Sequence, residues 1–121
     1  MKKKPSKKRS LQKKADRHWF ELLIEKNPTC EVCGNRAVQI HHFFPKGSFS
    51  NLRYDLENGI SICQGCHMKH HLRGDPTIHQ IIIKKRGTDW YNSLLEKSRE
   101  TIESSSRTIG YYEEIIKKLT N

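Results

Sequence analysis

The chain has 121 residues, which is the length of one small domain, and only 34% of them are hydrophobic. A core this small usually needs a crosslink or a bound metal ion. The net charge of +10 predicts an acidic partner, most commonly a nucleic acid. No apolar stretch approaches the roughly 18 residues of a membrane span, and no apolar segment follows the basic N-terminus as in a secretory signal. We therefore expect a cytoplasmic protein.

The positive charge is concentrated at the start of the chain. Residues 1–17 contain nine Lys or Arg and one acidic residue, whereas residues 88–121 contain five basic and six acidic residues. Most of the charge thus belongs to an N-terminal arm. Such an arm is expected to be mobile when free and to contact phosphates when bound; the alternative is a solubility tail or a localisation signal.

The hydrophobic pattern predicts a mixture of helices and short strands. Apolar residues recur at helical spacing in residues 10–26, beginning at Leu11 and ending at Leu23. Segments rich in β-formers predict strands at 38–43 and 59–62, with a loop at 44–55 between them. Further helices are expected at 66–73 and 77–85, and two more follow between residue 90 and residue 119. The apolar faces of these two C-terminal helices could also form the interface of a homodimer.

Four cysteines have the spacing of a metal site. Cys30 and Cys33 form one C-x-x-C pair, and Cys63 and Cys66 form a second. In a chain without export, cysteines are more often metal ligands than disulfides, and two such pairs supply the four thiolates of a tetrahedral Zn²⁺. Because four thiolates leave no position for water, we expect this Zn²⁺ to be structural.

Five of the seven histidines lie between positions 41 and 71. His41 and His42 are adjacent on the first predicted strand, and His67 and His71 share one face of a helix because they are four residues apart. His70 is a poorer candidate for that face. Two neighbours on a regular strand point in opposite directions, so His41 and His42 can reach one site only where the strand ends or twists. His18 and His79 lie outside this pattern and are expected at the surface.

These motifs resemble the HNH, or ββα-metal, endonucleases. The resemblance is carried by Ile40-His41-His42, by Tyr54 to Gly59 with Asn58, and by Cys63-x-x-Cys66-His67-x-x-x-His71. It covers about residues 29–74. The stretch from His41 to Gly74 is also similar to the catalytic core of bacteriocin DNases, and Leu52 to Trp90 has a weaker similarity to phage recombination endonucleases of the Rap/NinG type.

The resemblance implies a role for each residue. His42 corresponds to the general base, since a neutral imidazole can accept a proton from water. His41, His67 and His71 correspond to ligands of a catalytic divalent ion, with His70 as the alternative to His71. This ion would be Mg²⁺ or Mn²⁺, with Ni²⁺ or Zn²⁺ possible. Asn58 corresponds to a residue that orients His42 by hydrogen bonds to the backbone.

The sequence therefore predicts an α+β fold with a small ββα-metal core. This core is crosslinked by a Zn²⁺ ion bound to four cysteines and is flanked by helices at both ends. Three regions are expected: a basic arm at 1–17, the nuclease core at 18–87 and a helical extension at 88–121. The predicted function is metal-dependent hydrolysis of DNA in a bacterial or phage-infected cell. The alternatives are a branch-directed recombination nuclease and a non-catalytic zinc module that binds DNA. The candidate phosphate contacts are Lys7, Lys8, Arg9, Lys13, Lys14, Arg53 and Arg73.

Overall fold

The computed structural model describes residues 4–121, except for the side chains of Leu72 and Arg73. Its helices and strands are, in chain order, α1 (Lys7–Lys26), β1 (Gln39–His42), β2 (Gly59–Ile62), α2 (Gln64–Arg73), α3 (Thr77–Arg86), α4 (Thr88–Ser98) and α5 (Ile109–Thr120). Three short 3₁₀ helices join them: η1 (Ser50–Leu52), η2 (Leu56–Asn58) and η3 (Ser104–Ser106). The α+β class is as predicted. Within the described residues, no helix is both long and apolar enough to cross a bilayer.

Helix α1 begins earlier than the sequence pattern predicted. Its N-cap is Ser6, whose hydroxyl oxygen accepts a hydrogen bond from the backbone N–H of Arg9 (3.2 Å) and so satisfies one of the free amides of the first turn. The helix then continues without interruption to Lys26. Residues 7–17 are therefore the first half of a packed helix, and the expected boundary between residues 17 and 18 falls inside it. Residues 1–3 lie outside the described part of the chain.

The two strands pair antiparallel in a register that gives the sheet two different faces. His41 pairs with Ile60 and His42 pairs with Gly59. Paired residues point to the same side of a sheet, and successive residues alternate. His41 and Ile60 therefore lie on one face, and His42 and Gly59 lie on the other.

Helix α1 covers the face that carries His42. The helix approaches so closely that a Cβ at Gly59 would collide with Leu23 and would lie 2.9 Å from the Trp19 ring. Glycine at position 59 is thus required by the approach of the helix. Trp19 and Leu23, each 3% exposed, join Ile40 in the core on this side.

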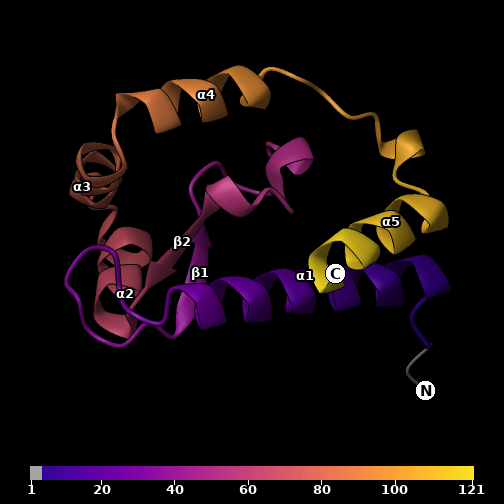
Figure 1. Ribbon diagram of the computed structural model, residues 1–121, viewed down its shortest axis with the longest axis horizontal. Helices are drawn as coiled ribbons and strands as arrows, with labels where there is room; N and C mark the ends of the chain where they lie inside the picture. Colours follow the sequence, from indigo (N-terminus) through magenta and orange to yellow (C-terminus); the bar gives the residue numbers. More distant parts are fainter. Residues whose placement is uncertain (1–3) are drawn as a thin grey trace.

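The opposite face of the sheet packs against α3 and α4. Ile60 and Ile82 are fully buried there, and Leu94 is 1% exposed. Phe43 and Leu52, from the segment that joins the strands, complete the cluster. The sheet thus lies between α1 on one side and α3 and α4 on the other (Figure 1).

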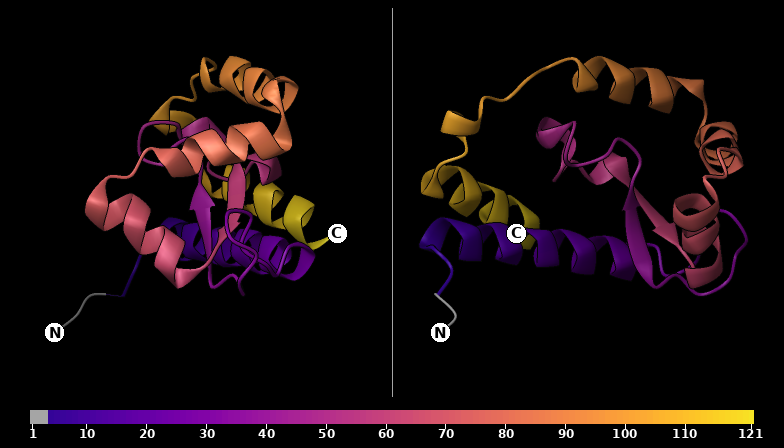
Figure 2. Two further views of the ribbon diagram at one scale, coloured as in Figure 1. Left: turned by 90° about the vertical axis from the view of Figure 1, so that its left-hand side faces the viewer. Right: turned by 180° about the vertical axis from the view of Figure 1, so that it is seen from behind.

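The C-terminal helix returns to the start of the chain. After α4, an extended segment with η3 leads to α5, which lies alongside the N-terminal half of α1 in Figure 1 and in the right-hand view of Figure 2. Tyr112 is buried in the α1 core cluster, and Ile115, Ile116 and Leu119 pack against it. The apolar stripe that could have supported a homodimer is therefore used within one chain.

Candidate metal centre and active site

The first cysteine pair sits on a tight turn before β1. An isolated antiparallel bridge between Thr29 and Arg36 closes the turn, and the N–H of Gly34 donates to the carbonyl of Cys30 (2.9 Å). Gly34 adopts a φ of +83°, which glycine reaches without steric cost. Cys30 and Cys33 are thereby placed at the tip of the turn.

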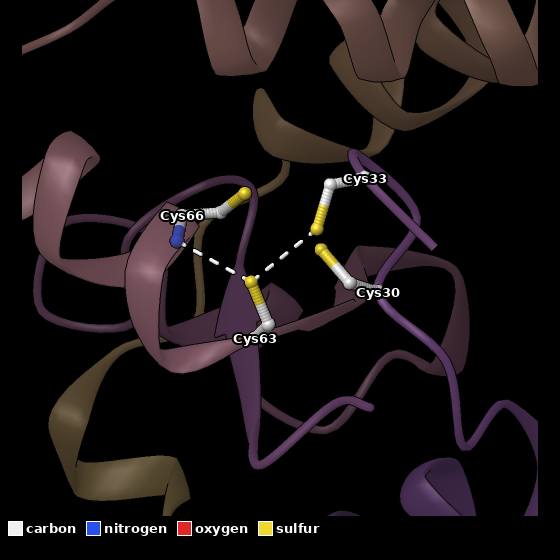
Figure 3. Close-up of side chains that lie close together, drawn as sticks. All are labelled: Cys30, Cys33, Cys63 and Cys66. Carbon is white, nitrogen blue, oxygen red and sulfur yellow. Dashed lines mark hydrogen bonds between the residues drawn. The ribbon is translucent and has the colours of Figure 1, made fainter. Parts of the chain in front are cut away.

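The second pair lies where β2 ends and α2 begins. Cys63 is the N-cap of α2, and its sulfur accepts a hydrogen bond from the backbone N–H of Cys66 (3.4 Å). The side chains of both pairs point toward a common centre (Figure 3). Within this cluster the sulfurs of Cys33 and Cys63 are 3.5 Å apart.

The geometry of the four cysteines fits a tetrahedral metal ion. All four sulfurs lie within 4.8 Å of one another. With Zn–S bonds of about 2.3 Å, a zinc tetrahedron has sulfur–sulfur edges of about 3.8 Å, so an ion requires little rearrangement. The cluster joins the turn before β1 to the start of α2. It can hold a metal ion with all four positions taken by sulfur.

The surroundings of the thiols favour ionisation at one sulfur. Burial raises the pKa of Cys30, but hydrogen bonds from the backbone amides of Cys33, Cys63 and Val32 outweigh this and lower the pKa to about 7. Burial raises the pKa of Cys66, and the neighbouring thiols raise it further. A complete set of four thiolates therefore requires the compensating charge of a bound cation.

A second centre lies in a pocket of about 360 Å³ between β1, α2 and α3. Six imidazoles line this pocket together with Lys46, and none of the described residues that line it has a carboxylate. These imidazoles belong to His41, His42, His67, His70, His71 and His79. The pocket thus combines several potential metal ligands with a single cationic side chain.

The predicted ligands of the catalytic ion come together in this pocket. His41 from β1 and His67 and His71 from α2 offer ring nitrogens that all lie within 4.8 Å of one another. Of the two alternatives for the last ligand, the geometry groups His71 with His41 and His67. His70 instead belongs to a group with His41 and His79.

The expectation that His79 lies at the surface is wrong. It is half-buried on α3, and its Nε2 atom is 3.0 Å from the Nε2 atom of His41. Its ring also stacks on Phe43, with 4.3 Å between the ring centroids. The sequence carries one signal for this position, because His79 lies between the buried Ile78 and Ile82 of the stripe that faces the sheet.

Three of the histidines that line the pocket, His41, His67 and His79, have lowered pKa values. Burial lowers the pKa of His41 to about 3, with the neighbouring histidines contributing further. Burial also lowers the pKa of His67 and of His79. These imidazoles are therefore neutral at pH 7, which is the form that binds a metal ion.

His42 lies on the other face of the sheet but reaches the same pocket, because β1 ends at this residue. Its Nε2 atom is 3.0 Å from the backbone carbonyl oxygen of Arg53. A carbonyl oxygen can only accept, so Nε2 donates and carries the proton of the neutral ring. Burial lowers the pKa of His42. The ring is thus neutral, with the lone pair on Nδ1.

Asn58 is fully buried and holds the loop that follows His42. Its Oδ1 atom accepts from the N–H of Phe44 (2.8 Å), and its Nδ2 atom donates to the carbonyls of Phe44 (3.0 Å) and Leu52 (3.1 Å). The side chain therefore uses its polar groups on the backbone. It is placed to fix the loop rather than to touch a substrate.

Of the candidate phosphate contacts, Arg53 is already paired with an acidic residue, and the side chain of Arg73 is not described. Arg53 forms a two-pronged ion pair with Asp16 of α1, at 2.8 and 2.7 Å, and its side chain is only 19% exposed. This pair holds the segment whose carbonyl receives the His42 hydrogen bond. The side chain of Arg73 lies outside the described residues.

The remaining candidate contacts are exposed on the first turns of α1: Lys7, Lys8, Arg9, Lys13 and Lys14. Lys8 and Arg9 line an open pocket of about 390 Å³ together with Arg107, which precedes α5. Sequence reasoning missed Arg107 because 98 positions separate it from Arg9. Along the axis of α1, Lys8 lies about 16 Å from Trp19, at 1.5 Å per residue.

The comparisons with known proteins agree with the central part of this description. The sequence profile of the HNH endonuclease family matches residues 30–73. No curated protein and no solved structure matches the chain. The matched segment spans both cysteine pairs, the two paired strands and α2. The matched segment, with its strand pair and helix, is thus similar to the HNH endonuclease family over residues 30–73.

Proposed function

We propose that the chain is a metal-dependent endonuclease that hydrolyses phosphodiester bonds in DNA. The observation that carries this proposal is the position of His42. Its Nε2–H donates a hydrogen bond to the carbonyl of Arg53, and its ring lines the same pocket as His41, His67 and His71. A base and a set of metal ligands thus share one pocket. A non-catalytic DNA-binding module offers no reason for either.

In this proposal His42 is the general base. With the proton on Nε2 fixed by the Arg53 carbonyl, the lone pair of Nδ1 accepts a proton from the attacking water. Trp19 stacks on the ring of His42 and restricts its orientation. Lys46, which lines the same pocket, is placed to attract the phosphate.

His41, His67 and His71 would hold the catalytic divalent ion. Such an ion, when bound, stabilises the negative charge that develops on the phosphate and the leaving oxygen. Imidazole ligands have a higher affinity for Mn²⁺, Ni²⁺ or Zn²⁺ than for Mg²⁺, although Mg²⁺ is more abundant. The four-cysteine cluster would hold a separate Zn²⁺ that stabilises the fold.

We further propose that the exposed basic residues of α1 contact the DNA backbone. Along the helix axis Lys8 lies about 16 Å from Trp19 and Lys14 about 7.5 Å, which corresponds to about five and about two base pairs of duplex at 3.4 Å for each step along a strand. Contacts of this kind give affinity without sequence specificity. In this proposal the basic residues are part of the folded domain, since α1 continues through residue 17, and no separate N-terminal arm is needed for DNA binding.

Cleavage of plasmid DNA with and without Mg²⁺ or Mn²⁺ tests the proposal. Wild-type protein should cut only with added divalent ion, and His42→Ala should reduce the cleavage rate by about 10²–10⁴-fold with zinc content and DNA affinity unchanged. His18→Ala is the matched control, because His18 lies on α1 and does not line the pocket. Cleavage by His42→Ala at the wild-type rate would exclude this base. A branched substrate in parallel separates general from branch-directed activity.

A further inference from the structure

A second group of imidazoles lies beside the proposed catalytic ligands. His41 of β1, His70 of α2 and His79 of α3 offer ring nitrogens that lie within 4.8 Å of one another. The group shares His41 with the first set and takes its other members from positions that the proposed nuclease mechanism does not use. His79 lies outside residues 30–73, the segment that the HNH family profile matches.

The spacing of this group suits a metal ion. The Nε2 atoms of His41 and His79 are 3.0 Å apart. Two nitrogens bound to one tetrahedral zinc at 2.0–2.1 Å are separated by about 3.3 Å. The two rings therefore need to move apart by only a few tenths of an ångström to bind one ion between them.

His70 provides an independent observation that points to a ligand. Its Nδ1 atom is buried and has no hydrogen-bond partner among the described residues. A buried nitrogen of this kind is unfavourable unless it is bound by a proton donor, an acceptor or a metal ion. The His70 ring stacks on that of His79, with 4.7 Å between the centroids, so both rings face the same space.

The surrounding structure holds His79 in this position. The adjacent Ile78 and the nearby Ile82 are buried and fix α3 against the rest of the core. The stacking of His79 on Phe43 fixes the ring from the other side. A site whose ligands are already ordered loses little conformational entropy when an ion binds.

We propose that His41, His70 and His79 form a second position for a late first-row transition-metal ion such as Zn²⁺ or Ni²⁺. A pocket whose described lining offers imidazoles and no carboxylate selects such ions over Mg²⁺. Because both positions require His41, an ion here competes with the catalytic ion. Excess Zn²⁺ therefore inhibits DNA cleavage, a consequence that rests on the nuclease function proposed above.

Zn²⁺ titration by calorimetry, with the cysteine cluster already loaded, tests the site without reference to cleavage. His67→Gln breaks the first set and should still bind one Zn²⁺ through His41, His70 and His79. The double variant His67→Gln with His79→Gln should bind it at least about tenfold more weakly. His67→Gln with His18→Gln is the matched control. Equal affinities of His67→Gln and the His79 double variant would overturn the proposal.

Nitrogen NMR of the histidine rings gives a second measurement that does not depend on the double variant. On addition of Zn²⁺ to His67→Gln, the ring signals of His70 and His79 should shift to positions typical of metal-bound imidazole. Shifts confined to His41 and His71 would show that the ion remains at the first position, and would overturn the proposal.

The inhibitory consequence is measured in a cleavage assay with Mn²⁺ held constant. Rising Zn²⁺ should inhibit the wild-type protein, and His79→Gln should require at least about tenfold more Zn²⁺ for the same inhibition. An unchanged Zn²⁺ dependence in His79→Gln would contradict the competition between the two positions. If no variant cleaves DNA under any condition, the nuclease proposal fails, while the calorimetric and NMR results still decide whether the second position exists.

Discussion

The indole of Trp19 stacks on the imidazole of His42, with 4.2 Å between the ring centroids and an interplanar angle of 10°. Trp19 belongs to α1, which precedes the segment that matches the HNH family. Its Nε1–H also donates to the carbonyl of Asp55 (3.2 Å), in the segment just before Asn58. Helix α1 therefore holds both the proposed general base and the loop that orients it.

Replacement of Trp19 should damage stability and cleavage together. Loss of a buried indole costs about 3–5 kcal/mol of unfolding free energy in Trp19→Ala. Trp19→Phe keeps an aromatic ring against His42 and should cost much less. Trp90→Ala is the control, because Trp90 also donates its Nε1–H to a carbonyl in the same segment, that of Glu57, but does not touch His42. Cleavage measured below all melting temperatures should fall further in Trp19→Ala than in Trp90→Ala.

Asn58→Ala should loosen the loop that follows His42. The substitution removes three hydrogen bonds to the backbone of Phe44 and Leu52, each worth about 1 kcal/mol net, and leaves their buried groups unpaired. We expect a loss of about 3 kcal/mol in a denaturant titration and a large fall in cleavage with zinc retained. Asn51→Ala, which removes a single bond to Lys97, is the control and should lose about 1 kcal/mol. Equal losses in the two variants would contradict the assigned role.

The four-cysteine cluster should bind one Zn²⁺ per chain and support the fold. Structural zinc contributes on the order of 10 kcal/mol in small zinc domains, so Cys30→Ser or Cys63→Ser should lower the melting temperature by at least about 10 °C. Zinc content by atomic emission, measured with thermal unfolding, checks this. His42→Ala should retain its zinc. A folded wild-type protein without zinc would show that the cluster serves another purpose.

Local patterns predicted the elements, but not which residues meet across the fold. The periodicity of Leu11 to Leu23 and the β-formers around Ile40 placed α1 and β1 within a few residues of their observed bounds. The spacing of the cysteine pairs likewise predicted their cluster. These features depend on neighbours in the sequence, and sequence patterns report such neighbours directly.

Other parts of the site depend on contacts between distant residues. Arg53 and Asp16 are 37 positions apart, and nothing near Arg53 indicates that an acid on α1 would take its charge. His79 lies on a helix that has no family motif, and its partner His41 is 38 positions away. His41 and His42 are neighbours on a strand, yet both line one pocket, because β1 ends at His42. The spacing of the two residues in the sequence does not reveal where the strand ends.

The basic residues of α1 should set the salt dependence of DNA binding. Because Leu11 packs in the core with α5, deletion of residues 2–14 would disturb the fold, so we favour substitution of Lys7, Lys8 and Arg9 by Gln, which keeps the helix. For each phosphate that the variant no longer neutralises, the slope of log K against log salt should fall by about 0.9. Lys117→Gln with Lys118→Gln, on the exposed end of α5, should leave the slope unchanged. An unaltered slope in the α1 variant would remove these residues from the DNA interface.

The pH dependence of cleavage should reflect the lowered pKa of His42. A general base works only when unprotonated, and burial of His42 disfavours its charged form, which lowers its pKa below the ordinary value of 6.5. The protein should therefore keep its full rate as the pH falls through 6.5 and lose it only at lower pH. Protonation of the metal ligands also reduces cleavage, so kcat is measured at several saturating Mn²⁺ concentrations, where that contribution disappears. An acidic limb at 6.5 or above, independent of Mn²⁺, would show that a solvent-exposed group rather than the buried His42 accepts the proton.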